Sequence, residues 1–127
     1  MTDALSALKD RVDALYLEYV FPVLATLRLG EAPEAAACEA ELLEAARVVG
    51  IRVRRYIMPE DLSQEDVDRL VREIRADRLL SALLILPLPA HLDREALASL
   101  AGEKYLEAAP CAELLSRVAD AAERSAR

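Results

Sequence analysis

Apolar residues recur at steps of three and four along the first segment of the chain. This spacing places them on one helical face, so we predict an amphipathic helix over residues 3–20. Pro22 ends this helix, because proline lacks the amide proton that a helix interior needs. Its inward face comprises Leu5, Leu8, Val12, Leu15 and Tyr19.

A β-prone stretch, Val23 to Leu29, follows and ends at Gly30. Next comes an Ala- and Glu-rich segment, Glu34 to Val49, whose residues favour a helix. Pro33 stands at its start, where a missing donor costs nothing, and Gly50 stands where a helix C-cap is expected.

Apolar and basic residues alternate in the first half of Ile51 to Met58, which predicts a strand with one solvated face at a sheet edge. We expect its arginines, Arg52, Arg54 and Arg55, to lie in water.

The second half of the chain repeats the order of helix and strand. Ser63 and Asp66 form a capping box for a helix that ends near Asp77, with Val67, Leu70, Val71 and Ile74 buried. The apolar run Leu83 to Leu86 predicts a strand covered on both faces. Asp93 caps a short helix through Leu100, and Ala109 to Arg127 forms the last helix, with Leu114, Leu115 and Val118 inward.

Alternating strands and helices call for parallel strands joined by right-handed helical crossovers. We therefore predict the α/β class: one three-layer α/β/α domain over residues 1–127, with a mostly parallel sheet of about three or four strands. A chain of 127 residues suits one domain and is too short for two ordinary ones.

Composition narrows the function classes. With 54% hydrophobic and 31% charged residues, we expect a folded, soluble protein. A net charge of −7 and only 4% aromatic residues argue against nucleic-acid binding. The sequence has no secretory signal pattern and no run long enough to span a membrane, so we expect a cytoplasmic location without membrane contact.

The two cysteines, Cys38 and Cys111, and the single histidine, His91, offer no metal-ligand spacing. We expect no metal site, and we expect each cysteine to be a small buried residue. A reactive pair of Cys38 and His91 is the alternative reading.

The segment LLILPLPAHLD, Leu83 to Asp93, is the most specific feature of the chain. Pro87 and Pro89 make the chain leave the sheet as a stiff shelf. Ligands of open α/β sheets bind at such carboxyl ends, so the shelf predicts a pocket wall. A rigid connection with no ligand is the alternative.

Three segments resemble the N-terminal catalytic domain of bifunctional methylenetetrahydrofolate dehydrogenase/cyclohydrolase, the FolD family. They are Pro22 to Ala35 (PVLATLRLGEAPEA), Glu44 to Val53 (EAARVVGIRV) and Leu86 to Asp93 (LPLPAHLD). The resemblance covers roughly Pro22 to Glu107. It implies the fold of the N-terminal domain of amino-acid-dehydrogenase-like proteins, to which FolD belongs.

The resemblance implies a catalytic tyrosine, a lysine four residues later and a glutamine just before LPLP. Counted from Gly30, these positions hold Cys38 and Leu42, and the glutamine position holds Ile85 or is deleted. We therefore expect no catalytic residues. Glu107 falls on the aspartate that holds the pterin, and the expected folate pocket is lined by Cys38, Leu42, Ile85, Pro87 and Glu107.

Only three glycines are present, and no GxGxxG motif can be drawn from them, so we expect no NAD(P) site and no dehydrogenase activity. The expected function is non-catalytic tetrahydrofolate binding, or an accessory or regulatory role with a protein partner over the pocket mouth. One alternative is an enzyme, either with residual cyclohydrolase activity through Glu107 and water or with a different reaction at Cys38. Another is a homo-oligomeric interaction module without a small ligand.

Overall fold

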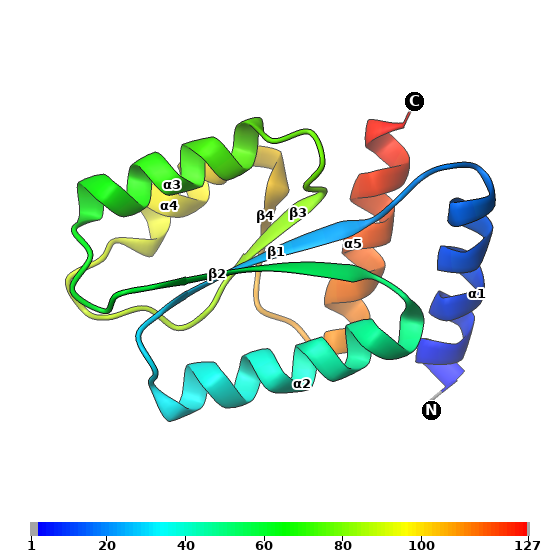
Figure 1. The fold of residues 1–127 in the computed structure, drawn as a ribbon, viewed down its shortest axis with the longest axis horizontal. Helices are drawn as coiled ribbons and strands as arrows, with labels where there is room; N and C mark the ends of the chain where they lie inside the picture. Colours follow the sequence, from blue (N-terminus) through cyan, green and yellow to red (C-terminus); the bar gives the residue numbers. More distant parts are fainter. Residues whose placement is uncertain (1–2, 127) are drawn as a thin grey trace.

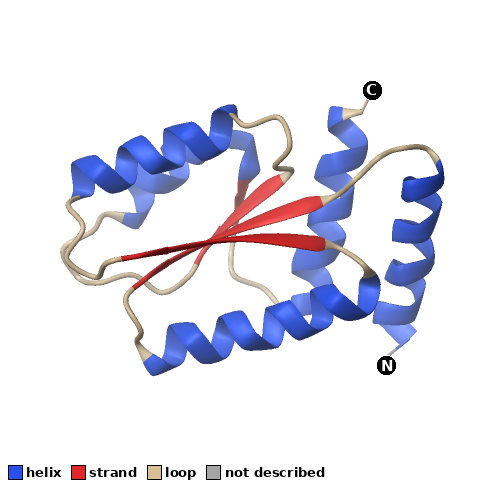
Figure 2. Cartoon of the chain, viewed as in Figure 1, coloured by secondary structure: helices blue, strands red, loops and turns tan. Residues whose placement is uncertain are grey.

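A four-stranded parallel sheet forms the centre of the computed structural model, which describes residues 3–126 (Figures 1 and 2). The strands lie in the order β2-β1-β3-β4. In register, Leu24 lies beside Val53 on one side and Ala82 on the other. The strands are β1 (Val23–Leu29), β2 (Arg52–Met58), β3 (Ala82–Ile85) and β4 (Tyr105–Leu106).

Helices cover both faces of this sheet (Figure 1). On one face lie α1 (Asp3–Leu17), α2 (Pro33–Val49) and α5 (Cys111–Ser125), and on the other lie α3 (Gln64–Ala76) and α4 (Arg94–Ala101). A short 3-10 helix, η1 (Gly102–Lys104), leads into β4.

The sheet separates two apolar cores. Side chains alternate along a strand, so Leu24 of β1 points into the core under α1, α2 and α5, whereas Ala25 and Leu27 point into the core under α3 and α4. Strand β3 is buried along its whole length, as its continuous apolar run predicts. The predicted three-layer α/β architecture with a parallel sheet is therefore confirmed.

Several boundaries differ from the sequence-based prediction, mostly by one or two residues; β2, for example, begins at Arg52 and not at Ile51. Strand β3 begins and ends one residue earlier than Leu83 and Leu86, and α5 begins at Cys111. Strand β4 has only two residues, too few to show a periodic pattern. The predicted end of the last helix at Arg127 lies outside the described residues.

The first helix ends at Leu17, so the prediction that Tyr19 belongs to its inward face is wrong. Tyr19 has a φ of 60° and is 83% exposed. The amide of Val20 donates to the carbonyl of Leu15 at 2.9 Å, and the amide of Tyr19 donates to Tyr16 at 3.0 Å. These two bonds form a Schellman ending, in which a left-handed residue terminates the helix. Tyrosine occupies the position that usually holds glycine.

The predicted capping residues occupy their expected places. The Ser63 hydroxyl accepts from the amide of Asp66, and the Asp93 carboxylate accepts from Glu95 and Ala96. Gly50 closes α2 with a φ of 86°. Within residues 3–126, no helix is both long and apolar enough to cross a membrane.

Candidate functional site

A groove of about 800 Å³ opens where β3 ends; we call it the carboxyl-end groove. The amide of Leu86 donates to Leu27 at 3.0 Å in the last ladder bond, after which Pro87 and Pro89 lack amide protons. The chain therefore leaves the sheet as the predicted shelf and forms one wall. The lining comprises Cys38, Leu84, Ile85, Leu86, Pro87, Leu88, Pro89, Ala90, Leu92, Arg94, Tyr105, Glu107, Ala108, Ala109 and Leu114.

Four of the five side chains expected in the pocket line this groove: Cys38, Ile85, Pro87 and Glu107. They come from three separate segments, α2, the shelf and the loop after β4. Leu42 is not among the lining residues. Its side chain is 1% exposed and packs in the core beneath α2, because it faces the sheet and the groove opens to one side.

The cysteines differ from expectation. Cys38 is exposed and Cys111 is partly buried, so the prediction of two buried thiols is wrong for Cys38. Cys38 directly precedes Glu39, which belongs to the buried, sheet-facing side of α2. Burial raises the pKa of the Cys111 thiol, and the nearby Glu41 and Cys38 raise it further.

His91 does not line the carboxyl-end groove with Cys38. Its Nε2 lies 2.9 Å from the carbonyl oxygen of Leu62, on the opposite layer. Among the described residues, no three histidine, cysteine, aspartate or glutamate side chains are grouped to hold a metal ion.

Arg94 is a groove residue that the sequence analysis missed. Its guanidinium donates to the carbonyls of Ile85 at 2.9 Å and Leu86 at 2.7 Å, and it lies 3.3 Å from the Tyr105 hydroxyl. It therefore ties the end of β3 to the start of α4. The sequence carried a signal: a cation at the first position of a helix is disfavoured by the helix dipole, so another interaction must hold it there.

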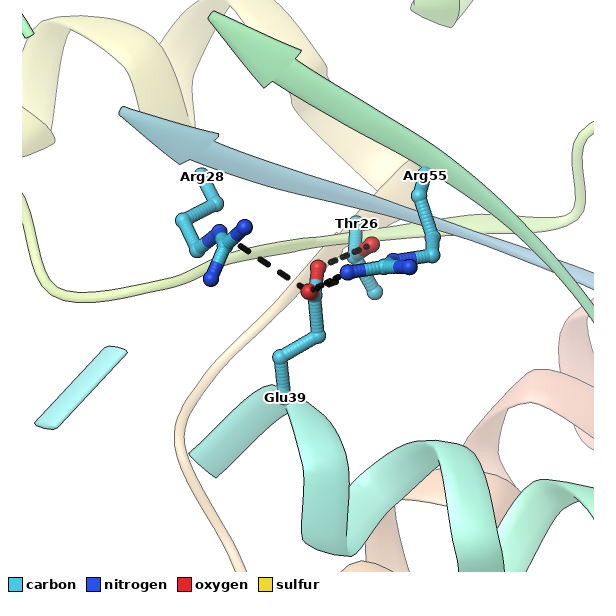
Figure 3. Close-up of polar contacts among 4 residues, drawn as sticks. All are labelled: Thr26, Arg28, Glu39 and Arg55. Carbon is cyan, nitrogen blue, oxygen red and sulfur yellow. Dashed lines mark hydrogen bonds and ion pairs between the residues drawn. The ribbon is translucent and has the colours of Figure 1, made fainter. Parts of the chain in front are cut away.

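Four polar side chains gather around the buried carboxylate of Glu39, between β1, β2 and α2 (Figure 3). We call this group the Glu39 cluster: Thr26, Arg28, Glu39 and Arg55. Arg55 donates two bonds to Oε1 of Glu39, at 3.2 and 2.6 Å, and the Thr26 hydroxyl donates to Oε2 at 3.2 Å. The carboxylate is 1% exposed.

The three arginines of β2 are exposed, as predicted, although Arg55 also takes part in the Glu39 cluster. Strand β2 is an edge strand, as predicted. The side chain of Arg55 reaches toward α2, where its guanidinium pairs with Glu39. The sequence held a signal for the burial of Glu39, because this residue continues a stripe of buried residues on α2 at steps of three and four. The other members of that stripe are Ala35, Leu42, Ala46 and Val49.

Both lysines of the chain are held away from the carboxyl-end groove. Lys9 on α1 pairs with Asp13 at 2.8 Å. The Lys104 ammonium donates to the carbonyls of Ile74 at 3.2 Å and Asp77 at 2.6 Å, at the end of α3. Burial lowers the pKa of Lys104, and Asp77 partly opposes this effect.

The fold and the groove together define the class of the protein. It is a parallel α/β domain with a groove at the carboxyl ends of the strands, the place where open α/β sheets receive ligands. The chain belongs to the tetrahydrofolate dehydrogenase/cyclohydrolase family, because the family model for the catalytic domain matches residues 2–104.

Curated relatives agree with this assignment. The chain is 36% identical over 89 residues to the bifunctional protein FolD of Phenylobacterium zucineum, covering 68% of this chain and 30% of the relative. It is 32% identical over 95 residues to FolD of Clostridium kluyveri, covering 73% of this chain and 34% of the relative. The chain thus spans about a third of the length of these relatives.

Solved structures show the same fold. The FolD methylenetetrahydrofolate dehydrogenase/cyclohydrolase of Campylobacter jejuni aligns with a TM-score of 0.76 at 20% identity, over 80% of this chain and 36% of that one. The Trypanosoma brucei FolD, solved with NADP and an inhibitor, aligns with a TM-score of 0.73 at 24% identity, over 79% of this chain and 35% of that one.

Proposed function

We propose that this protein binds a tetrahydrofolate-type ligand in the carboxyl-end groove and does not turn it over, acting as an accessory or regulatory protein of one-carbon metabolism. The observation that carries this proposal is the composition of the groove. The proline shelf is present, and Cys38, at the position that the resemblance gives to the tyrosine, lines the groove. Leu42, at the position that it gives to the lysine, is buried in the core outside the groove lining. A volume of about 800 Å³ suits a ligand of this size.

The groove has polar side chains suited to binding. Glu107 is exposed at its edge, and a carboxylate accepts hydrogen bonds from adjacent N–H groups such as those of a pterin. Arg94 has its guanidinium already committed to the shelf carbonyls. Its role is therefore to hold the wall in shape, which lowers the cost of ordering the site on binding.

The loss of turnover follows from the chemistry of the replacements. Neither leucine nor isoleucine transfers a proton, and the loss of a positioned acid-base group reduces rates by about 10²- to 10⁴-fold. Neither lysine lines the groove, since Lys9 and Lys104 have partners elsewhere. We propose no nicotinamide cofactor, because the three glycines form no dinucleotide-binding motif.

Two measurements test this function. Calorimetric titration with tetrahydrofolate should give saturable binding, which Glu107→Ala weakens and Glu103→Ala leaves unchanged; Glu103 is exposed and lies outside the groove lining. Hydrolysis of 5,10-methenyl-tetrahydrofolate, followed by its absorbance, should run at about a hundredth or less of the rate of a FolD relative. Absence of saturable binding contradicts the proposal. Turnover at the rate of the relative, abolished by Glu107→Ala, supports the cyclohydrolase alternative instead.

The second candidate function is a homo-oligomeric interaction module. Tyr19, Phe21 and Leu79 are 83%, 53% and 73% exposed and line a second hollow at the amino ends of the strands. Exposed apolar groups gathered in one place mark contact surfaces. Arg52 and Arg78 lie beside them, which suits the acidic surface of a second copy with a net charge of −7.

Sedimentation velocity over a concentration series tests this second candidate. An oligomer that Leu79→Glu dissociates supports it. A monomer at every concentration contradicts it, whatever the folate titration shows.

A further inference from the structure

Arg28 is a mostly buried cation whose Nε–H lacks an acceptor. Its side chain is 11% exposed, and its Nε is fully buried with no hydrogen-bond partner. Within residues 3–126, the only ion pair of this guanidinium is with Oε1 of Glu39, 3.8 Å from Nε, too long for a hydrogen bond. The Nε–H is thus a buried donor without an acceptor, and such a donor destabilises a fold.

Glu39 does not accept a hydrogen bond from Arg28. Its Oε1 already accepts two bonds from Arg55, and its Oε2 accepts from Thr26 (Figure 3). The Glu39 cluster therefore contains two guanidinium groups and one carboxylate, which leaves one positive charge in excess. A second anionic group beside Arg28 would offset this charge and accept a hydrogen bond from the Nε–H.

Arg28 is not among the residues that line the carboxyl-end groove, but its position in β1 places it near that groove. It is the second-last residue of β1, at the carboxyl end of the sheet, and it shares a sheet face with Thr26 two residues before it. On that face Leu84 and Leu86 line the carboxyl-end groove, and so does Cys38, the residue before Glu39. Arg28 thus lies on the sheet face onto which the groove opens.

Nearby acidic residues do not neutralise Arg28. Glu31 follows the turn at Gly30, and Glu60 packs against that same glycine. Both are exposed, and neither forms an ion pair with Arg28 in the described part of the chain.

We propose that Arg28 is the anchor of an oxyanion site at the carboxyl end of β1, which takes a carboxylate or phosphate group. The planar fork of an arginine matches the paired oxygens of either group. The net charge of −7 repels anions from the molecule as a whole, so binding here is local and not a general charge effect. This site is independent of the proposed folate binding.

Nuclear magnetic resonance of the unaltered protein provides the first test. Arginine Nε–H signals are followed during titration with sodium sulfate, against sodium chloride at matched ionic strength. We expect the Arg28 signal to move saturably with sulfate and not with chloride. If the Arg28 signal is unmoved while exposed arginines respond, the site does not exist.

Variants provide the second test, with the sulfate-induced rise in the unfolding midpoint as the readout. Arg28→Gln should weaken sulfate binding about tenfold or more, the typical effect of losing a hydrogen bond to a charged group. Arg72→Gln, an exposed arginine on α3, is the matched control and should have no effect. Glu39→Gln removes the competing carboxylate, so sulfate should raise its midpoint more than that of the unaltered protein.

The sign of the Glu39→Gln result separates a ligand site from a structural role. A purely structural cluster predicts that sulfate stabilises no variant more than the parent, and that result would overturn the proposal. Repeating the titration with phosphate and with acetate then assigns the group: tighter Arg28-dependent binding of phosphate indicates a phosphate ligand, and tighter binding of acetate indicates a carboxylate. If neither binds through Arg28, the proposal fails.

Discussion

Glu39 occupies a helix position that would ordinarily hold an aliphatic residue. A buried carboxylate is stable only when it is paired and hydrogen-bonded, and Arg55 and Thr26 supply three bonds to its two oxygens. The partners come from different strands, so a single side chain joins α2 to β1 and β2. Removing the Glu39 carboxylate would leave the mostly buried Arg28 without its ion pair, and an uncompensated buried charge is strongly destabilising.

The Cys111 thiol gives a pH-dependent prediction at the same scale. Its pKa is raised, chiefly by burial, so less thiolate is present at a given pH than in a free cysteine. We expect alkylation of Cys111 by iodoacetamide to reach half its maximal rate at a higher pH than alkylation of free cysteine, whose pKa is about 8.5. Mass spectrometry of the Cys111 peptide over a pH series measures this, and a profile at or below that of free cysteine would contradict it.

The sequence predicted single residues where a local rule decides. Ser63, Gly50 and Asp93 were identifiable because caps depend on neighbours in the chain. The exposed Cys38 was not, because the many alanines of α2 blur its inward face. Arg94 and Arg28 were not predicted either, since their contacts join segments that are distant in sequence.

At the scale of elements, the end of α1 shows how a pattern can overrun its helix. The spacing of apolar residues continues to Tyr19, yet the helix ends at Leu17 and the chain turns at Tyr19 itself, which is left-handed. Periodicity indicates which side chains could share a helix face, but it does not indicate where the backbone turns. Strand β4 was missed for the opposite reason, since two residues form no period.

Tyr19 therefore gives a prediction about α1. A left-handed conformation costs a non-glycine residue about 1–2 kcal/mol, and the exposed ring of Tyr19 contributes little packing. Replacing Tyr19 by glycine would relieve this strain, but part of the stabilisation is offset because glycine loses more backbone entropy on folding. We expect Tyr19→Gly to raise the free energy of unfolding by about 0.5–1 kcal/mol in urea titrations.

Tyr19→Ala is the matched control, because alanine keeps the Cβ that causes the strain. It should not stabilise the protein. Equal effects of glycine and alanine would show that the backbone conformation is not the source of the strain.

At the scale of the whole molecule, the alternation of strands and helices was enough to predict a parallel three-layer fold. The order β2-β1-β3-β4 was not predicted, because side-chain pattern says which strands are buried and not which are neighbours. The groove was anticipated at the proline shelf, since proline acts locally. Its opposite wall, formed by α2 and the loop after β4, depends on the complete fold.

The two cores predict how stability is distributed. Leu115 on α5 is 0% exposed in the core beneath α1 and α2, so Leu115→Ala should lower the free energy of unfolding by about 2–5 kcal/mol. Leu79→Ala makes the same chemical change at a side chain that is 73% exposed and should stay within about 0.5 kcal/mol of the parent. Urea denaturation of both variants measures the contrast, and similar losses would contradict the assigned core.

The burial of Glu39 also separates it from the surface ion pairs in their response to salt. At 1 M ionic strength the Debye length is about 3 Å, so exposed pairs lose most of their attraction. Lys9–Asp13 and Glu44–Arg47 belong to this group. The Glu39 carboxylate is 1% exposed, and pairs that are buried or partly buried are screened much less by salt. Concentrated salt would therefore weaken the ion pairs on the helix surfaces, while the link between α2 and the sheet through Glu39 persists.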